Sequence, residues 1–310
     1  MNDRIDKIKT AISGFSELLP LISELPPDEF EIRFHEKLNR LNGMSLEVPE
    51  QRRELMGHLY KTCWEERDIG KVQYRSRYRP LGYPGDHLII DWIYTQRVAS
   101  TGEGKLWDEF YHRQAAPQAV RNRKTFFCET FLKLLNEYSG SLSVLNIASG
   151  PCRDIAEALE KVNTKTGDIL FHCVDMDKNA IAYAKVLLNG ASAKATFKWE
   201  AANAFKLRPA QKYDLVWSAG LFDYLEDRYA IALLARMWKW TKDGGSVIVG
   251  NFHPRNPSRN YMEWCGDWFL IHRTEPEMVL LCEQAGIRRE NICFDQEPLG
   301  VNIFCRGRKG

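Results

Sequence analysis

The sequence contains no long apolar run. No stretch approaches the roughly 20 consecutive apolar residues that a helix needs to cross a bilayer, although hydrophobic residues make up 44% of the 310-residue chain. The first ten residues, MNDRIDKIKT, also lack the cationic-then-apolar order of a secretory signal peptide. We therefore expect a globular, cytoplasmic protein without a membrane span.

An excess of charge of one sign is also missing. The 43 basic and 41 acidic residues leave a formal charge of +2, which provides no overall field to attract nucleic acid or an anionic membrane. The eight cysteines form no CxxC pair, so neither a zinc knuckle nor a redox dithiol is indicated. These absences favour a small-molecule partner, no nucleic acid and no metal, and they leave the oligomeric state open.

The spacing of apolar residues changes near residue 140. Before this point apolar residues recur at helical spacing, and we predict helices at about 5–22, 29–41, 49–66, 87–97, 105–113 and 117–138. The stretch 69–86, IGKVQYRSRYRPLGYPGD, is rich in Arg, Tyr, Gly and Pro, which predicts an ordered loop without a regular element. We expect an all-helical domain over residues 1–115 that acts as a lid or substrate domain.

After residue 140 short apolar runs alternate with helical stretches, which is typical of a parallel sheet wound with helices. Strands are predicted at 143–148, 169–175, 196–200, 213–219, 246–252, 291–296 and 301–306, and helices at 153–162, 178–189, 227–241 and 275–285. A short turn at Pro298, Leu299 and Gly300 joins the last two strands, so one of them must be antiparallel. The predicted fold over residues 116–310 is an α/β, Rossmann-like sheet of seven strands with a terminal antiparallel hairpin.

The first predicted strand ends in a turn of small residues, NIASGPCRD. Small residues let the backbone approach a ligand closely, and the helix start that follows offers free N–H donors. Only one glycine is present, so the dinucleotide fingerprint GxGxxG is not satisfied. The turn is either a ligand contact or an ordinary strand-to-helix connection. Its candidate cofactor-binding residues are Asn146, Ala148, Ser149, Gly150, Pro151 and Asp154.

Polar and small residues also follow the next three strands. Asp175 ends the second strand about 25 residues beyond Gly150, close to the offset at which an acidic side chain meets ribose hydroxyls. The alternative is that the Asp175–Asp177 turn only caps the next helix. Further candidate cofactor residues at these strand ends are Met176, Asn203, Ala204, Ser218, Ala219 and Gly220.

Over roughly residues 118–306 the sequence resembles the class I S-adenosylmethionine-dependent methyltransferases. The resemblance puts Asp175 in the ribose position and Asn203 in the adenine position, and implies a methyltransferase sheet, S-adenosyl-L-methionine as cofactor and S-adenosyl-L-homocysteine as product. The sequence departs from the family in the first turn, where NIASGPCRD replaces the usual acidic-then-GxGxG form.

Four segments resemble a bacterial subgroup, the 3-hydroxypalmitic acid methyl ester biosynthesis proteins. They are RYRPLGYPGD (77–86), SGPCRD (149–154), GLFDYLEDR (220–228) and NFHPRNPSRNYMEW (251–264). In that subgroup a methyl group is passed to a fatty-acid carboxylate to form a quorum signal. The resemblance implies that this chain methylates the carboxyl oxygen of a 3-hydroxy fatty acid or a similar carboxylate.

Two further segments are dense in side chains that could bind ligands. Near the N-terminal helices, Tyr78, Arg79 and Tyr83 are expected to contact the cofactor, and Arg121 or Arg123 could hold its methionine carboxylate, with a solvated helix face as the alternative. The segment beyond the fifth strand is expected to bind the acceptor through Asn251, Arg255, Arg259, Tyr261, Trp264, Trp268 and Arg273. The plainer alternative is that the aromatic rings only pack and the arginines are solvated.

The acceptor determines whether a catalytic base is needed. A carboxylate is already ionised at neutral pH, whereas an alcohol, amine or phenol would usually need a general base. The candidate bases are Tyr224, His253 and His272. Two other interpretations stay open: an O- or N-methyltransferase of another specialised metabolite or peptide, and a catalytically silent cofactor-binding module.

Overall fold

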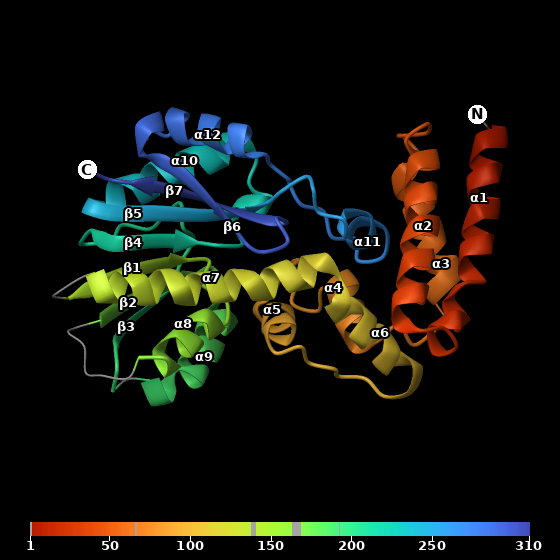
Figure 1. Ribbon diagram of the computed structural model, residues 1–310, viewed down its shortest axis with the longest axis horizontal. Coiled ribbons are helices and arrows are strands. Elements are labelled where there is room, and N and C mark those ends of the chain that lie inside the picture. The colour runs from red at the N-terminus through yellow and green to blue at the C-terminus, as the bar shows by residue number, and fades with distance from the viewer. Residues whose placement is uncertain (1, 66, 138–140, 163–168, 192) are drawn as a thin grey trace. The chain divides into compact units, whose positions relative to one another are not determined.

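The computed structural model describes residues 2–65, 67–137, 141–162, 169–191 and 193–310 (Figure 1). The chain divides into two compact units. Unit 1 comprises residues 1–85, 95–118 and 257–269, and unit 2 comprises residues 86–94, 119–256 and 270–310. The chain therefore passes between the units more often than a single domain boundary requires.

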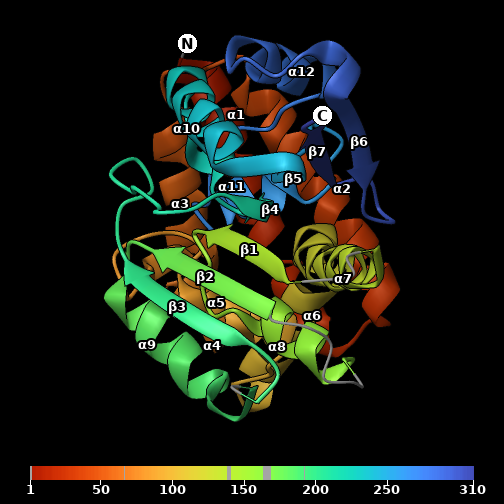
Figure 2. The same ribbon diagram turned by 90° about the vertical axis from the view of Figure 1, so that its left-hand side faces the viewer.

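Unit 2 is built on one seven-stranded sheet (Figure 2). Its strands are β1 (Leu142–Ile147), β2 (Ile169–Asp175), β3 (Thr196–Ala201), β4 (Tyr213–Ser218), β5 (Thr241–Phe252), β6 (Ile292–Gln296) and β7 (Asn302–Arg308). They lie in the order β3-β2-β1-β4-β5-β7-β6. Neighbouring strands from β3 to β5 are parallel, and β7 runs antiparallel to both β5 and β6. The predicted sheet with a terminal antiparallel hairpin is confirmed.

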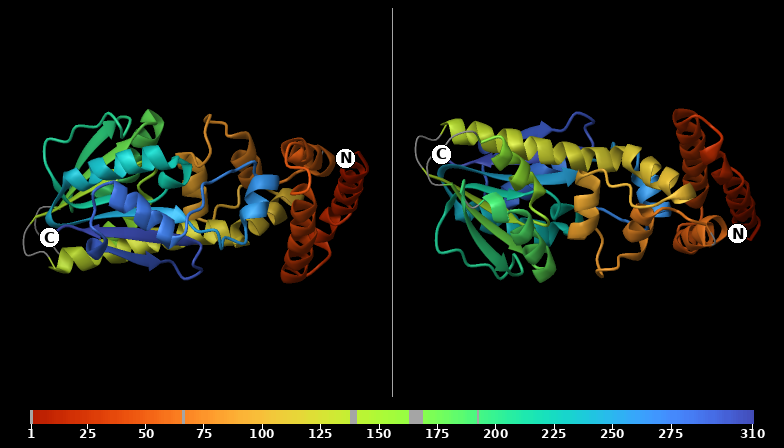
Figure 3. Two further views of the ribbon diagram at one scale, coloured as in Figure 1. Left: turned by 90° about the horizontal axis from the view of Figure 1, so that it is seen from above. Right: turned by 90° about the horizontal axis from the view of Figure 1, so that it is seen from below.

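Helices cover both faces of this sheet, because alternate strand residues are apolar on opposite sides. One core joins the sheet to α7 (Ala115–Glu137), α8 (Arg153–Glu160) and α9 (Lys178–Leu187). The other joins it to α10 (Asp227–Trp240) and α12 (Glu275–Gln284). Figures 2 and 3 show the same division, with α8 and α9 grouped together and α10 beside α12. In β7, Phe304 enters the first core while Ile303 and Cys305 enter the second.

Unit 1 is helical in the residues described. It contains α1 (Asn2–Ser16), η1 (Leu19–Ser23), α2 (Pro27–Ser45), α3 (Arg52–Trp64), α4 (Lys71–Tyr78), α6 (Gly102–Arg113) and α11 (Arg259–Trp264). Its interior is rich in aromatic rings: the Phe34 ring lies 4.9 Å from that of Phe110 and 5.0 Å from that of Phe15. Edge-on pairs of this kind add to the stabilisation from burial. Within these described segments, and in the described part of unit 2, no helix is long and apolar enough to cross a membrane.

Two sequence predictions about local structure were wrong. The stretch 69–86 was expected to have no regular element, yet Lys71–Tyr78 forms α4, which ends at Arg79 in the left-handed region at a φ of 48°. The segment after β5 contains α11, which the sequence did not indicate. The predicted helix ends at Glu66 and at 138–140 lie outside the described residues.

Four short elements complete the chain: α5 (His87–Tyr94) in unit 2, and the single turns η2 (Asn189–Ala191), η3 (Phe222–Tyr224) and η4 (Arg289–Asn291). The helix α5 begins where Asp86 accepts hydrogen bonds from the amides of Leu88 and Ile89, at 2.9 and 3.0 Å. This N-terminal capping explains why a helix starts directly after the YPG turn.

Gly250 in β5 tests the packing of the sheet against the end of β4. A Cβ at this position would lie 2.8 Å from the carbonyl oxygen of Ala219, which belongs to the backbone and has little room to move. Gly250→Ala should therefore lower the free energy of unfolding by about 1–3 kcal/mol, measured by urea denaturation. Gly190→Ala is the matched control, because no described atom lies within 4 Å of its added methyl group. Equal stability of the two variants would contradict this packing.

Candidate functional site at the carboxyl ends of the strands

The turn from β1 to α8 has an unusual backbone. Ala148, Gly150 and Cys152 adopt φ values of +52°, +53° and +55°, so every second residue of the turn is left-handed. Left-handed conformations are uncommon outside glycine and cost about 1–2 kcal/mol for other residues. The spacing AxGxC therefore has the backbone that a GxGxG sequence would adopt easily. The departure from the family motif lies in the side chains, and Gly150 keeps an open side with no described atom within 4 Å of an added Cβ.

Asp175 joins this turn to the end of β2. Its Oδ2 accepts a hydrogen bond from the Gly150 amide at 2.9 Å, and its Oδ1 accepts one from the Asp177 amide at 2.9 Å. Burial raises the pKa of the Asp175 carboxyl, while the two amides act in the lowering direction. Each oxygen keeps a further lone pair, so a fixed carboxylate can accept from two vicinal hydroxyl groups.

Several buried polar atoms near this carboxylate have no partner in the described structure. They are Asn146 Nδ2 in β1, Ser149 Oγ in the turn and Ser218 Oγ at the end of β4. Buried polar groups are nearly always hydrogen-bonded, so a cluster without partners points to a missing ligand or water. A polar small molecule at the carboxyl ends of β1 and β4 would satisfy these atoms.

After β2 and β3, an exposed apolar side chain, Met176, lies close to a polar amide, Asn203. Met176 is 74% exposed, although its side chain is apolar. The Asn203 side-chain oxygen accepts from the Phe205 amide at 2.8 Å, and its Nδ2 lies 4.0 Å from the Met176 sulfur. An exposed thioether next to an amide donor suits the face and edge of a purine ring.

Arg123 of α7 brings a buried positive charge to the end of β4. The residue is 6% exposed, and its Nη1 donates to the Ala219 carbonyl at 3.1 Å. A Cβ on Gly220 would lie 3.0 Å from Nη1, so the glycine gives the guanidinium its room. Burial by itself lowers the pKa of Arg123, but Tyr94 and Asp223 raise it, and the net direction is upward. The residue therefore stays cationic inside the protein.

Two buried carboxyl groups lie in the electrostatic range of this arginine. Burial raises the pKa of Asp154 to about 6 and that of Asp223 to about 6, while Arg123 acts in the lowering direction on both. Asp223 also accepts from the Phe252 amide at 2.6 Å. A single buried guanidinium thus partly compensates the charge of two buried carboxyl groups.

The end of β5 is held by Arg273. Its Nη1 donates to Asn251 Oδ1 and to the Phe222 carbonyl, both at 2.9 Å, and its Nη2 donates to Asp227 at 2.8 Å. Asn251 Nδ2 donates in turn to the carbonyls of Phe252 and Ile271, each at 2.9 Å. Both predicted acceptor residues are buried, and their hydrogen-bonding groups are already used within unit 2.

The histidines near β5 are engaged as well. His253 Nδ1 accepts from the backbone and side chain of Arg255, at 3.0 and 2.9 Å, and its Nε2 lies 3.2 Å from Glu275. His272 contacts the Leu270 carbonyl through Nδ1 and the Asn256 side chain through Nε2. Tyr224 lies in η3, next to Asp223. In this arrangement, His253 and His272 would have to break protein contacts before taking a proton from a substrate.

The remaining predicted residues are divided between the units. Arg121, Pro151 and Ala204 lie in unit 2, with Pro151 buried in the β1 turn. Seven lie in unit 1: Tyr78, Arg79, Tyr83, Arg259, Tyr261, Trp264 and Trp268. The segment 251–273, which is predicted to bind the acceptor, is divided between the units, because 257–269 belongs to unit 1. The two chain ends of this insertion, Asn256 and Leu270, remain in unit 2.

Most of these unit 1 side chains have structural contacts. Trp264 is fully buried and donates to Asn42 at 3.1 Å, and the buried Tyr261 contacts the Gln73 side chain. Arg259 pairs with Glu263 at 2.8 Å, and Arg79 with Asp267 at 3.0 Å. These contacts favour the packing alternative for Trp264 and Tyr261, and a ligand role for the others stays a prediction.

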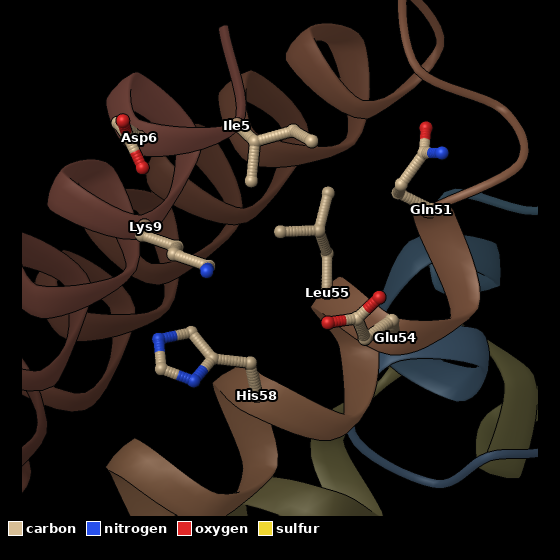
Figure 4. Close-up of a pocket in the computed structure, with 7 residues that line it drawn as sticks. All are labelled: Ile5, Asp6, Lys9, Gln51, Glu54, Leu55 and His58. Carbon is tan, nitrogen blue, oxygen red and sulfur yellow. The ribbon is translucent and has the colours of Figure 1, made fainter. Parts of the chain in front are cut away.

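Unit 1 also contains a surface hollow of about 340 Å³ (Figure 4). It is lined from α1 by Ile5, Asp6 and Lys9 and from the α3 side by Gln51, Glu54, Leu55 and His58. None of these residues was predicted to bind the cofactor or acceptor.

Sequence reasoning missed three unit 2 residues near the site: His87, Asp91 and Tyr94. His87 Nδ1 lies 3.2 Å from Asp177, and Asp91 accepts from Arg153 at 3.1 Å. A signal was present, because His87, Asp91 and Tyr94 are spaced to share one face of an otherwise apolar helix.

Comparison with known proteins agrees with this geometry. Residues 144–245 match a family model described as a methyltransferase domain. No curated protein matches the chain. Among solved structures, a possible exported protein from Bordetella parapertussis is 17% identical, with a TM-score of 0.61 over 97% of this chain and 96% of that one.

Two methyltransferase structures share the fold. Magnesium protoporphyrin IX methyltransferase (ChlM) from Synechocystis PCC 6803, with bound SAH, is 11% identical, with a TM-score of 0.51 over 72% of this chain and 98% of that one. The S-adenosylmethionine-dependent methyltransferase SibL, in its apo form, is 13% identical, with a TM-score of 0.51 over 98% of this chain and 96% of that one. At such identities the likeness shows the fold alone. The methyltransferase-domain match over residues 144–245 and the shared sheet topology together support an S-adenosylmethionine-dependent methyltransferase activity.

Proposed function

We propose that the carboxyl ends of β1 to β4 hold S-adenosylmethionine, with the Asp175 carboxylate on the ribose hydroxyls. The observation that carries this assignment is the cluster of unpartnered buried atoms, Asn146 Nδ2, Ser149 Oγ and Ser218 Oγ, near a carboxylate fixed by two amides. The left-handed β1 turn and the open side of Gly150 let the backbone approach the ligand. Met176 and Asn203 are assigned to the adenine.

Arg123 is the residue we assign to the methionine carboxylate of the cofactor. Its guanidinium lies at the Ala219–Gly220 floor and is buried, so a carboxylate there would meet a desolvated, geometrically fixed donor. Its Nε has no partner in the described structure. Arg121, the other candidate from the sequence, serves below as the comparison.

The proposed acceptor is the carboxylate of a 3-hydroxy fatty acid or a similar small molecule, which would become a methyl ester. S-adenosylmethionine supplies an electrophilic methyl group, and the protein has to align donor and acceptor and exclude water. A carboxylate needs no general base, which agrees with the engagement of His253 by Arg255 and Glu275. The four sequence segments that resemble the 3-hydroxypalmitic acid methyl ester subgroup support the same class of acceptor. The cytoplasmic location stays a prediction.

Asp175→Ala should abolish cofactor binding at accessible concentrations. The variant loses two hydrogen bonds to a charged acceptor, worth about 3 kcal/mol or more together, which corresponds to at least a 100-fold rise in Kd. Calorimetric titration with S-adenosylhomocysteine measures it. Asp243→Ala, at an exposed aspartate 4.0 Å from Lys309, is the control and should bind as the wild type does. Unchanged affinity of Asp175→Ala would remove the ribose assignment.

Arg123→Met and Arg121→Met can be separated with two ligands. S-adenosylhomocysteine contains the amino-acid carboxylate, whereas 5′-methylthioadenosine has the same adenosine thioether without it. Arg123→Met should raise the Kd of S-adenosylhomocysteine by about 10- to 100-fold, as expected for a lost charged hydrogen bond, and leave that of methylthioadenosine nearly unchanged. Arg121→Met should alter neither. The reverse pattern would assign the carboxylate to Arg121.

The acceptor class is tested by the alkali stability of the product. Incubation with radiolabelled S-adenosylmethionine and 3-hydroxy fatty acids should give a product that releases volatile methanol in base, because methyl esters hydrolyse and methyl ethers or N-methyl groups do not. The Asp175→Ala variant is the blank. An alkali-stable product would favour another metabolite or peptide as acceptor, and cofactor binding without turnover on any acceptor would favour the silent module.

A further inference from the structure

The helix α5 is short, yet it carries three buried polar side chains. His87, Asp91 and Tyr94 are all at most 9% exposed, in a helix that otherwise reads LII and WI. They are four and three residues apart, which puts them on one face of the helix. Burying polar groups is unfavourable unless each has a partner, so this face is built to contact polar groups.

Each of the three side chains contacts a different part of the site. His87 Nδ1 lies 3.2 Å from Asp177 Oδ2, which is within ion-pair distance but does not meet hydrogen-bond geometry. Asp91 accepts two hydrogen bonds from Arg153 and one, at 2.8 Å, from the Tyr183 hydroxyl. Tyr94 lies within electrostatic range of Arg123, whose positive charge acts to lower the pKa that burial raises at the Tyr94 hydroxyl.

These partners are the residues next to the proposed cofactor contacts. The Asp177 amide donates to Asp175, and the other Asp177 oxygen caps α9 by accepting from the Asn179 amide at 2.8 Å. Arg153 is the first residue of α8, directly after the left-handed β1 turn. Arg123 lies on the floor at Ala219. None of the three α5 side chains therefore needs to touch the cofactor in order to influence its binding.

The course of the chain adds a second observation. Residues 86–94 belong to unit 2, whereas the chain before them, to Gly85, and after them, from Thr95, belongs to unit 1. This nine-residue segment is thus covalently joined at both ends to unit 1, while its side chains contact three parts of unit 2 next to the proposed cofactor site. A displacement of residues 86–94 would therefore alter all three contacts together.

We propose that α5 is a positioning helix whose docked state and cofactor binding stabilise each other, with His87 as the positioning residue for the Asp175–Asp177 turn. This inference rests on the proposed cofactor site. If the cofactor binds best to the docked arrangement, bound cofactor must by linkage favour docking of α5. Tethering by chain connectivity would then make the state of unit 1 a regulator of cofactor affinity.

His87 is tested by three variants. His87→Ala should raise the Kd of S-adenosylhomocysteine by about 3- to 30-fold, the range of coupling through a residue that does not touch the ligand. The affinity for methylthioadenosine should fall by the same factor, because His87 is proposed to position the Asp175 carboxylate, which binds the ribose that both ligands contain. Arg123→Met, in contrast, should affect only the ligand that has an amino-acid carboxylate. His87→Asn, whose amide nitrogen stands close to the Nδ1 position, should restore most of the loss. His58→Ala, at a histidine that lines the surface hollow between α1 and α3, is the matched control and should change the Kd of neither S-adenosylhomocysteine nor methylthioadenosine (Figure 4).

Docking itself is measured by amide hydrogen exchange over residues 86–94. In the wild type, saturating S-adenosylhomocysteine should slow exchange of these amides, and His87→Ala should reduce the slowing. Wild-type affinity in His87→Ala, or exchange in 86–94 that is unchanged at saturation, would overturn the inference while leaving the cofactor site intact. Failure of the wild type to bind S-adenosylhomocysteine would overturn the proposed site, and the inference with it.

Discussion

The Asp175 carboxylate is the interaction on which the site depends. By accepting hydrogen bonds from the amides of Gly150 and Asp177, it fixes the turn after β1 relative to the turn after β2. Neither turn has a regular element of its own to define it. Because these contacts form within the protein, the carboxylate is oriented before a ligand arrives, and little of the binding free energy has to be spent on ordering it.

The β1 turn shows how a motif can change while its backbone does not. Ala148 and Cys152 occupy left-handed positions that glycine would adopt without strain. Such strain persists only where surrounding structure fixes it. Cys152 is completely buried in the core formed by α7 to α9, and the Gly150 amide is held by Asp175. A sequence search for the GxGxG motif would not find this turn, because only one of its three left-handed residues is a glycine. The left-handed φ at every second residue shows that its backbone matches such a motif.

Buried charge forms the second layer of the site. Arg123 compensates Asp154 and Asp223, whose pKa values burial raises to about 6. Burying an arginine is unfavourable unless its charge and its donors have partners; here the Ala219 carbonyl accepts from Nη1, while Nε has no hydrogen-bond partner among the described residues. Together with the unpartnered Asn146, Ser149 and Ser218 atoms, this charge gives the ends of β1 and β4 a polarity that the sheet itself does not require. At the end of β5, in contrast, the side chains of Arg273 and Asn251 already make hydrogen bonds to each other and to neighbouring protein groups.

Strand periodicity, a three-residue turn and the offset from Gly150 are local properties of the chain, so the sheet, its terminal hairpin and Asp175 at the end of β2 could all be predicted from the sequence. It did not show that 86–94 joins unit 2, that 257–269 joins unit 1, or that Arg273 and His253 already have protein partners. The tertiary structure decided these points. A side chain's residue type states which bonds it can make, but which of them it makes depends on groups brought close from distant parts of the chain, and periodicity carries no record of those partners.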